Sequence, residues 1–303
     1  MTHKLLIVVA GPTAVGKTAL AIDLAKKYNT EIISADSRQI YRELTIGTAK
    51  PDAKELATVK HHFINSHSIS EEYDAASFGN DALTVIKELF KTHDKVVMCG
   101  GSGLYIKAVC EGFDDIPEIP DQIREQLITN FEAYGISWLQ QQIQERDPEI
   151  ASSIDMQNPH RMIRALEVKI GTGQSIACFQ TKKKLNHEFA ISKIGLELPR
   201  ETLYERIDKR MDEMIEAGLF NEAKSVSQYR DANALQTVGY QEIFDFMDGL
   251  YDYDEAVRLL KRNSRRYAKR QMTWFRRDPE FRWFIATDRN AIFDYVESFK
   301  SKE

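Results

Sequence analysis

The stretch GPTAVGKT at residues 11–18 decides the fold of this 303-residue chain. It satisfies every fixed position of the phosphate-binding pattern G-x-x-x-x-G-K-[ST], in which backbone N–H groups and the start of a helix point together at an anion. An apolar run of buried-strand type precedes it at residues 5–10, and apolar residues at helical spacing follow over 20–28. A chance match is a weak alternative in this context, so the sequence predicts a strand, a phosphate-binding loop and a helix.

The residues of this loop are the predicted anion site. It consists of Gly11, Pro12, Thr13, Ala14, Val15, Gly16, Lys17 and Thr18. We expect Lys17 to neutralise phosphate oxygens and the Thr18 hydroxyl to bind Mg²⁺. The pattern alone leaves open which phosphate binds, and whether ATP is among the ligands.

The composition is that of an ordinary globular protein with 43% hydrophobic and 29% charged residues. No signal peptide or membrane span is recognisable, so we expect a cytoplasmic protein. Cys99, Cys110 and Cys178 follow no metal-binding or redox spacing, and Cys99 is interpreted as a core residue. A net charge of −5 argues against general nucleic-acid affinity but not against a local basic patch.

Alternating patterns predict an α/β fold with a P-loop-type parallel sheet flanked by helices, and a mainly helical insertion domain. Further strands are expected at residues 32–34, 96–99 and 194–198, and the segment after residue 218 is expected to be mostly helical. The pattern changes after Gly112, where helical periodicity replaces strand signals. We therefore assign residues 1–116 and 191–303 to the catalytic core and 117–190 to the insertion.

An acidic residue follows the second predicted strand. A nucleotide hydrolase or kinase normally has an Asp after a strand to hold Mg²⁺, but the strand at 96–99 continues into Gly100 and Gly101. Asp36 instead stands at the carboxyl edge of the sheet, where ligands of open α/β folds bind. It is the best candidate for an acid or base, although a turn or helix-capping aspartate is about equally common at such a position.

Seven motifs in order along nearly the whole chain resemble the tRNA dimethylallyltransferase family. They are GPTAVGKT, ISADSRQIY, IGTAKP (residues 46–51), GGSGLY, QNPHRMIRALEV (157–168), TVGYQE (237–242) and KRQMTWFRR (269–277). The resemblance implies transfer of a dimethylallyl group from dimethylallyl diphosphate to N6 of adenosine 37, beside the anticodon of tRNAs that read codons beginning with U. It also implies Mg²⁺, a monomer on tRNA, and an insertion that grips the anticodon stem-loop.

The resemblance assigns roles to several residues. Lys17 and Thr18 would stabilise the departing diphosphate, and Asp36 would accept a proton from the adenine amino group. Arg206 and Arg210 lie four residues apart and could clamp the diphosphate, with Arg206 the stronger candidate, although spacing alone favours a solvated face. Removal of Asp36 is expected to impair turnover more than binding.

Most of the residues expected to contact tRNA lie within these motifs, where Gln and Asn side chains could read base edges. The expected contacts are Asp36, Ser37, Arg38 and Gln39, then Gln157, Asn158, Pro159, His160 and Arg161, then Gln236, Thr237, Val238, Gly239, Tyr240 and Gln241, together with Ser102 and Arg124. Asn158 followed by Pro159 is more typical of a helix N-cap than of a base-reading residue. Ser102 replaces the threonine usual in the family and keeps the hydroxyl.

Eight cations stand within the seventeen residues from Lys261 to Arg277, which favours contact with RNA phosphates. Arg265 and Arg266 belong to this group, and a solvated helix paired with the acidic stretch 245–255 is the alternative. Two other functions use the same loop: a small-molecule kinase, and a noncatalytic RNA-binding protein. The missing strand-terminal Asp opposes the first, and the presence of Lys17, Thr18 and Asp36 opposes the second.

Overall fold

The computed structural model describes residues 4–180 and 184–299. It divides into two compact units, Met1–Gly112 with Asn186–Glu303, and Phe113–Leu185. These boundaries fall four or five residues before the predicted ones, after residues 116 and 190. The second boundary is earlier because residues 186–190 already lead into a strand of the sheet, which begins at Ala190. The predicted tRNA-binding role of the smaller unit does not follow from this division.

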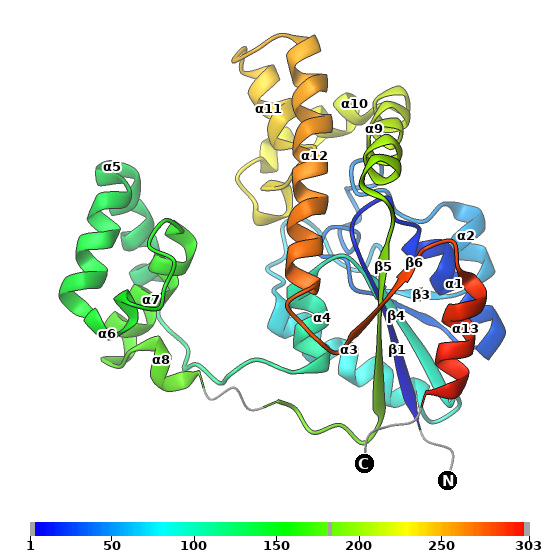
Figure 1. The fold of residues 1–303 in the computed structure, drawn as a ribbon. Helices are drawn as coiled ribbons and strands as arrows, with labels where there is room; N and C mark the ends of the chain where they lie inside the picture. The colour runs from blue at the N-terminus through cyan, green and yellow to red at the C-terminus, as the bar shows by residue number, and fades with distance from the viewer. Residues whose placement is uncertain (1–3, 181–183, 300–303) are drawn as a thin grey trace. The chain divides into compact units, whose positions relative to one another are not determined.

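The larger unit is built on a six-stranded, fully parallel sheet with the order β3-β2-β4-β1-β5-β6 (Figure 1). The strands are β1 (Leu5–Ala10), β2 (Ile32–Ser34), β3 (His61–His62), β4 (Lys95–Gly100), β5 (Ala190–Glu197) and β6 (Phe281–Ile285). The predicted fold class is confirmed. The sequence analysis missed β3 and β6, because a two-residue strand is too short to show a pattern and β6 is a partly exposed edge strand in a mostly helical segment.

The first strand occupies the centre of the sheet because all six of its residues are buried and both of its edges are paired. Its side chains alternate between two hydrophobic clusters. Ile7 and Val9 pack with α1 (Lys17–Tyr28) and α13 (Arg289–Ser298) on one face. Leu6 and Val8 pack with α3 (Ala75–Leu89) and α4 (Gly103–Cys110) on the other. Helices cover both faces, as a parallel sheet requires.

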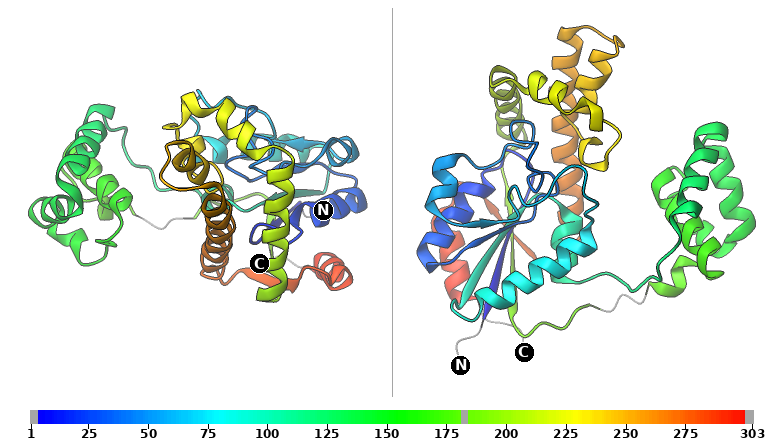
Figure 2. Two further views of the ribbon diagram at one scale, coloured as in Figure 1. Left: turned by 90° about the horizontal axis from the view of Figure 1, so that it is seen from above. Right: turned by 180° about the vertical axis from the view of Figure 1, so that it is seen from behind.

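Helices connect and extend the sheet. In the larger unit they are α1 (Lys17–Tyr28), α2 (Ala53–Thr58), α3 (Ala75–Leu89), α4 (Gly103–Cys110), α9 (Arg200–Glu216), α10 (Leu219–Ser225), α11 (Gln241–Met247), α12 (Tyr253–Phe275) and α13 (Arg289–Ser298), with 3₁₀ turns at Ser227–Tyr229 and Asn233–Leu235. Figures 1 and 2 show α9 and the long α12 side by side beyond the carboxyl end of β5. A third cluster, which includes Leu44, Leu219 and Tyr240, joins these helices to the loops after β2.

The smaller unit is helical, as predicted. It contains α5 (Asp121–Arg146), α6 (Pro148–Ala151), α7 (Pro159–Thr172) and α8 (Ile176–Phe179). Gly135, with φ +73°, interrupts α5 and divides it into two helices. Leu139 and Leu166 are fully buried in a core between α5 and α7. Within the described residues, no helix is long and apolar enough to cross a membrane.

Candidate active site

The loop between β1 and α1 is the floor of a cavity at the carboxyl edge of the sheet. Gly11 has φ +153°, and a Cβ there would lie 2.7 Å from the Leu196 carbonyl oxygen, so only glycine fits this close approach. Thr13, Ala14, Lys17 and Thr18 line the cavity, whereas Val15 is fully buried in the core. Because α1 begins at Lys17, its first N–H groups and positive end face the same space.

Lys17 supplies the cation of this loop. Its ammonium group donates a hydrogen bond of 2.8 Å to the Pro12 carbonyl oxygen. Burial lowers the pKa of Lys17 to about 8, and the nearby Asp36 partly opposes this shift. Lys17 is therefore about half deprotonated near pH 8. An anion bound in the cavity would favour the protonated, charged form of the side chain.

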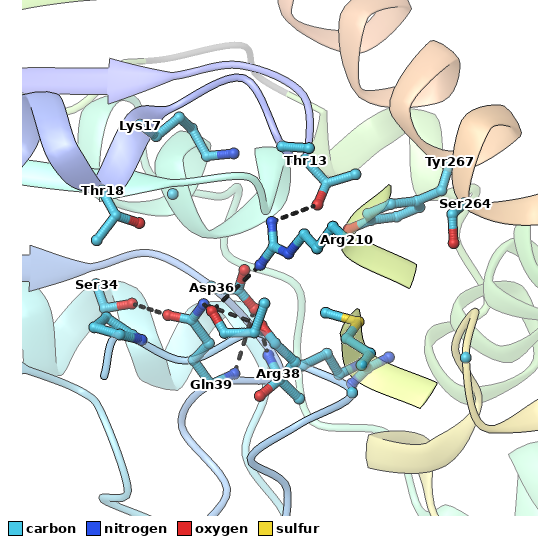
Figure 3. A pocket seen from close by; sticks show the side chains of 18 of the residues that line it. Thr13, Lys17, Thr18, Ser34, Asp36, Arg38, Gln39, Arg210, Ser264 and Tyr267 are labelled. Carbon is cyan, nitrogen blue, oxygen red and sulfur yellow. Dashed lines mark hydrogen bonds between the residues drawn. The ribbon is translucent and has the colours of Figure 1, made fainter. Parts of the chain in front are cut away.

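Asp36 lies in the turn after β2 and also lines the cavity. Its Oδ1 accepts hydrogen bonds from the backbone N–H groups of Arg38 and Gln39, at 2.9 and 3.3 Å, so it does stabilise a turn. Among the described residues, no hydrogen bond engages Oδ2. The carboxylate lines the cavity and faces the Arg210 guanidinium (Figure 3). One oxygen fixes the turn, and the other is available to a ligand.

The two candidate arginines occupy different environments. Arg210, on α9, lines the cavity, where its guanidinium donates to the Thr13 hydroxyl and to the Ala49 carbonyl oxygen, each at 3.4 Å (Figure 3). Arg206 is exposed and does not line the cavity. The structure places Arg210, and not the stronger candidate Arg206, at the cavity. The stripe of α9 that lines the cavity runs through Ile207, Arg210, Met211 and Met214, and Arg206 lies just outside it.

One wall of the cavity is apolar. It is formed largely by α9 and the start of α10, through Ile207, Met211, Met214 and Leu219. Cys99, near the end of β4, packs against the hydrophobic core, as its sequence context indicated, and also lines the cavity. Burial raises the pKa of this thiol to about 12, so it is neutral at physiological pH. The cavity thus combines a cationic end with a hydrocarbon-lined side.

A glutamine that the sequence analysis overlooked holds two loops of the site together. Gln271, buried on α12, accepts a hydrogen bond of 2.8 Å from the Thr13 N–H and donates one of 2.9 Å to the Gly101 carbonyl oxygen. These partners lie far from it in sequence, so no local pattern could reveal the contact. His61 also lines the cavity from β3, and its Nδ1 forms a hydrogen bond of 2.8 Å with the Val59 carbonyl oxygen.

The segments predicted to contact tRNA in the larger unit are divided between cavity and interior. Arg38, Gln39, Thr237, Val238 and Gly239 line the cavity. The Ser102 hydroxyl accepts a hydrogen bond from the Ser37 N–H at 2.9 Å, and the exposed Gln241 side chain donates to Gln236 at 2.6 Å.

The structure contradicts one of these predictions. Tyr240 has no exposed surface, and its hydroxyl donates to Glu222, so it is a core residue and not an RNA contact. The local sequence TVGYQE does not indicate this burial.

The predicted contacts in the smaller unit lie at the start of α7. Asn158 accepts a hydrogen bond from the Arg161 N–H and is the helix N-cap, with Pro159 in the first turn. Gln157, His160 and Arg161 are exposed. Arg124, on α5, forms an ion pair of 3.1 Å with the buried Glu167. The side chain of Arg124 is nevertheless 49% exposed, so one end of the pair remains accessible.

Some cations in the basic segment of α12 already form ion pairs with acidic side chains of the protein. Arg265 pairs with Asp208 and Lys261 with Asp212, both on α9, and not with the acidic stretch 245–255. This corrects the expectation that Arg265 contacts RNA phosphates, since its charge is already matched. The exposed cations of this helix and of the residues after it include Arg266, Lys269, Arg270 and Arg277. A basic face therefore exists, but it is narrower than the sequence suggested.

Comparison with known proteins gives the family of this fold and site. A family model described as IPP transferase matches residues 39–278. The chain belongs to the IPP transferase family. It is 51% identical to the tRNA dimethylallyltransferase of Cytophaga hutchinsonii over 296 residues, which is 98% of this chain and 97% of that protein.

Two solved structures of IPP transferases resemble the chain along its length. The tRNA isopentenylpyrophosphate transferase of Bacillus halodurans is 38% identical, with a TM-score of 0.72 and coverage of 97% of this chain and 96% of that one. A eukaryotic dimethylallyltransferase, described as acting on tRNA, is 26% identical, with a TM-score of 0.80 and coverage of 99% and 81%. The resemblance drawn from the seven sequence motifs is thereby confirmed.

Proposed function

We propose that this chain is a tRNA dimethylallyltransferase that transfers a dimethylallyl group from dimethylallyl diphosphate to N6 of adenosine 37, in tRNAs that read codons beginning with U, and releases diphosphate. The observation that carries the proposal is the composition of one cavity. Lys17 and Arg210 form its cationic end, the apolar wall lies beside them, and Asp36 offers a free carboxylate oxygen. A small hydrocarbon diphosphate matches the first two features, and a nucleophile that must lose a proton matches the third.

The diphosphate would bind at the start of α1. Lys17 and the loop N–H groups would stabilise the negative charge that develops as the C–O bond to the leaving diphosphate breaks. Arg210 would bind the same group from the opposite side, since its guanidinium already spans the cavity between Thr13 and Ala49. Catalysis at this end is electrostatic and requires no covalent intermediate with the protein.

Residues suited to Mg²⁺ are present beside this anion site. The Thr18 hydroxyl points into the cavity that Asp36 also lines, and hydroxyl and carboxylate oxygens are ligands that Mg²⁺ prefers (Figure 3). We propose that Thr18 holds the ion. When bound, Mg²⁺ would neutralise charge on the diphosphate.

Asp36 would act as the general base. The adenine N6 attacks C1 of the dimethylallyl group, the bond between C1 and the diphosphate oxygen breaks, and the proton from N6 passes to Oδ2 of Asp36. The backbone N–H groups of Arg38 and Gln39 hold Oδ1, which keeps the carboxylate in one orientation. The adenine has to leave its stack to reach this oxygen, as in other enzymes that modify a base.

The tRNA would be held outside the cavity by sequence-independent contacts. Exposed cations of α12 such as Arg266 and Arg270, and the helical insertion with the exposed Arg161, are suited to phosphate contacts. We further propose that the protein is cytoplasmic and that it binds tRNA as a monomer. Light scattering of the complex with tRNA would test the monomeric state.

Incubation with labelled dimethylallyl diphosphate, Mg²⁺ and unmodified tRNA, followed by nucleoside mass analysis, tests the reaction. Prenylated adenosine formed without ATP is expected, and a tRNA carrying guanosine at position 37 should stay unmodified. ATP consumption with a small acceptor, without prenylated tRNA, would refute the proposal in favour of a kinase.

A further inference from the structure

A glutamate outside the cavity binds one of the loops that line it. Glu222, on α10, accepts hydrogen bonds from the N–H groups of Thr45, Ile46 and Gly47 at 2.9, 2.8 and 2.9 Å. Its Oε1 also accepts the hydroxyl of the buried Tyr240 at 2.7 Å. A carboxylate that receives three consecutive backbone N–H groups fixes the direction of the chain at that point, because hydrogen bonds to a charged acceptor are shorter and stronger than those between neutral groups.

The loop tolerates little displacement at this point. A Cβ on Gly47 would lie 2.6 Å from the Tyr240 hydroxyl oxygen, so the backbone touches the tyrosine directly. Tyr240 is completely buried in the cluster that joins α9, α10 and α11. Glu222 and Tyr240 together therefore tie the loop to a rigid part of the fold.

The next residues of the same loop hold two side chains of the active site. The carbonyl oxygens of Thr48 and Ala49 accept hydrogen bonds from the Gln39 amide at 3.2 and 3.1 Å. The Ala49 carbonyl oxygen also accepts the Arg210 guanidinium at 3.4 Å. Gln39 belongs to the turn that orients Asp36. Hydrogen bonds and the backbone of residues 47–49 thus connect Glu222 to the Arg210 guanidinium and to the turn that carries Asp36.

We propose that Glu222 is a positioning residue for the transfer reaction, which sets the Thr48 and Ala49 carbonyl oxygens and through them the Arg210 guanidinium. The inference rests on the proposed function. It assigns Glu222 no contact with either substrate. Loss of the carboxylate should weaken diphosphate binding and turnover while the affinity for tRNA is unchanged, because the path ends at the anion site.

The variant Glu222→Gln tests this with nearly the same shape. Its amide keeps one oxygen but turns an NH₂ group toward a backbone N–H, so at least one bond is replaced by a clash of donors. We expect kcat/KM for dimethylallyl diphosphate to fall about 10- to 100-fold, the cost of small misplacement of a reacting group. The dissociation constant for tRNA should stay within about twofold. Glu216→Gln removes an exposed charge nearby on α9 and is the matched control.

A double-mutant cycle separates positioning from general destabilisation. If Glu222 acts through Arg210, Glu222→Gln should lower kcat/KM by less than about threefold in an Arg210→Ala background. Equal fold losses in both backgrounds would overturn the proposal. Should Glu222→Gln fail to fold, Tyr240→Phe removes one bond to the same carboxylate, and its loss should show the same dependence on Arg210.

Calorimetric titration with inorganic diphosphate and Mg²⁺ keeps this test independent of the reaction. Glu222→Gln should bind diphosphate about tenfold more weakly than the wild type, and this loss should vanish when Arg210 is Ala. If the wild type binds diphosphate but does not prenylate tRNA, the proposed function fails while the positioning role is still measured. Unchanged diphosphate affinity in a folded Glu222→Gln protein would overturn the positioning role.

Discussion

The replacement Lys17→Met should make the unliganded protein more stable at neutral pH. A fall of the pKa of Lys17 from 10.5 to about 8 disfavours the charged form by about 3 kcal/mol in the folded state. Because Lys17 lines the cavity and is only partly buried, water screens part of this cost. The lost hydrogen bond to Pro12 offsets about 1 kcal/mol more. We expect a net gain of about 1–2 kcal/mol at pH 7, measured by urea unfolding.

The stability difference between the wild type and Lys17→Met should depend on pH in a defined direction. Below about pH 8 the lysine is charged in both folded and unfolded states, and the folded state carries the full cost. Between about 8 and 10.5 the unfolded state binds more protons, so wild-type stability rises relative to Lys17→Met. The advantage of the variant should therefore shrink as pH rises through this window. A variant that is less stable at pH 7, or a difference independent of pH, would refute the reasoning.

The Lys17 charge lowers the stability of the unliganded protein, but it should raise the affinity for an anionic ligand. Without the ammonium group, affinity for inorganic diphosphate should fall about 10- to 100-fold, the value of a charge-assisted hydrogen bond. In the wild type, kcat/KM for the prenyl donor should decline above about pH 8, because Lys17 of the unliganded enzyme loses its proton there. Wild-type thermal stability should rise more on addition of diphosphate than that of the variant. If kcat/KM of Lys17→Met declines with the same apparent pKa as that of the wild type, the titrating group is not Lys17.

Three further predictions follow from named contacts. Asp36→Asn should lower kcat by about 10²- to 10⁴-fold with tRNA affinity within a few-fold; equal loss of both would remove the base assignment. Gln271→Glu should destabilise the fold by about 1–3 kcal/mol in urea unfolding, because it replaces the donor to the Gly101 carbonyl with an acceptor, and should also weaken diphosphate binding. Arg266→Ala should reduce the slope of log tRNA affinity against log salt concentration by about 1, whereas Arg265→Ala, already paired with Asp208, should leave it unchanged. Identical slopes would show that the exposed basic face does not meet phosphate.

The sequence predicted those parts of the fold that depend on local chemistry. The phosphate-binding loop, the central buried strand and the helical insertion follow from patterns within about ten residues, and each is present. The edge strand β6 was missed because only one of its edges is paired, so its residues do not form a buried run.

The site was predicted less completely than the fold, for a physical reason. Spacing placed Arg206 and Arg210 on one helix but could not show which one turns toward the cavity. Gln271 and Glu222 reach partners more than 150 residues away, and such contacts leave no local periodicity. The pairing of Arg265 with Asp208 on a neighbouring helix was hidden in the same way.

The central place of β1 has a consequence for synthesis of the protein on the ribosome. This strand emerges before both of its partners, and one of them, β5, begins at Ala190, about 90 residues after β4 ends. At translation rates of about 5–20 residues per second, one edge of a wholly apolar strand lacks its partner for roughly 5–20 s while the insertion is made. A longer insertion or slower codons within it would extend that interval, and with it the period in which the nascent chain is open to misassociation.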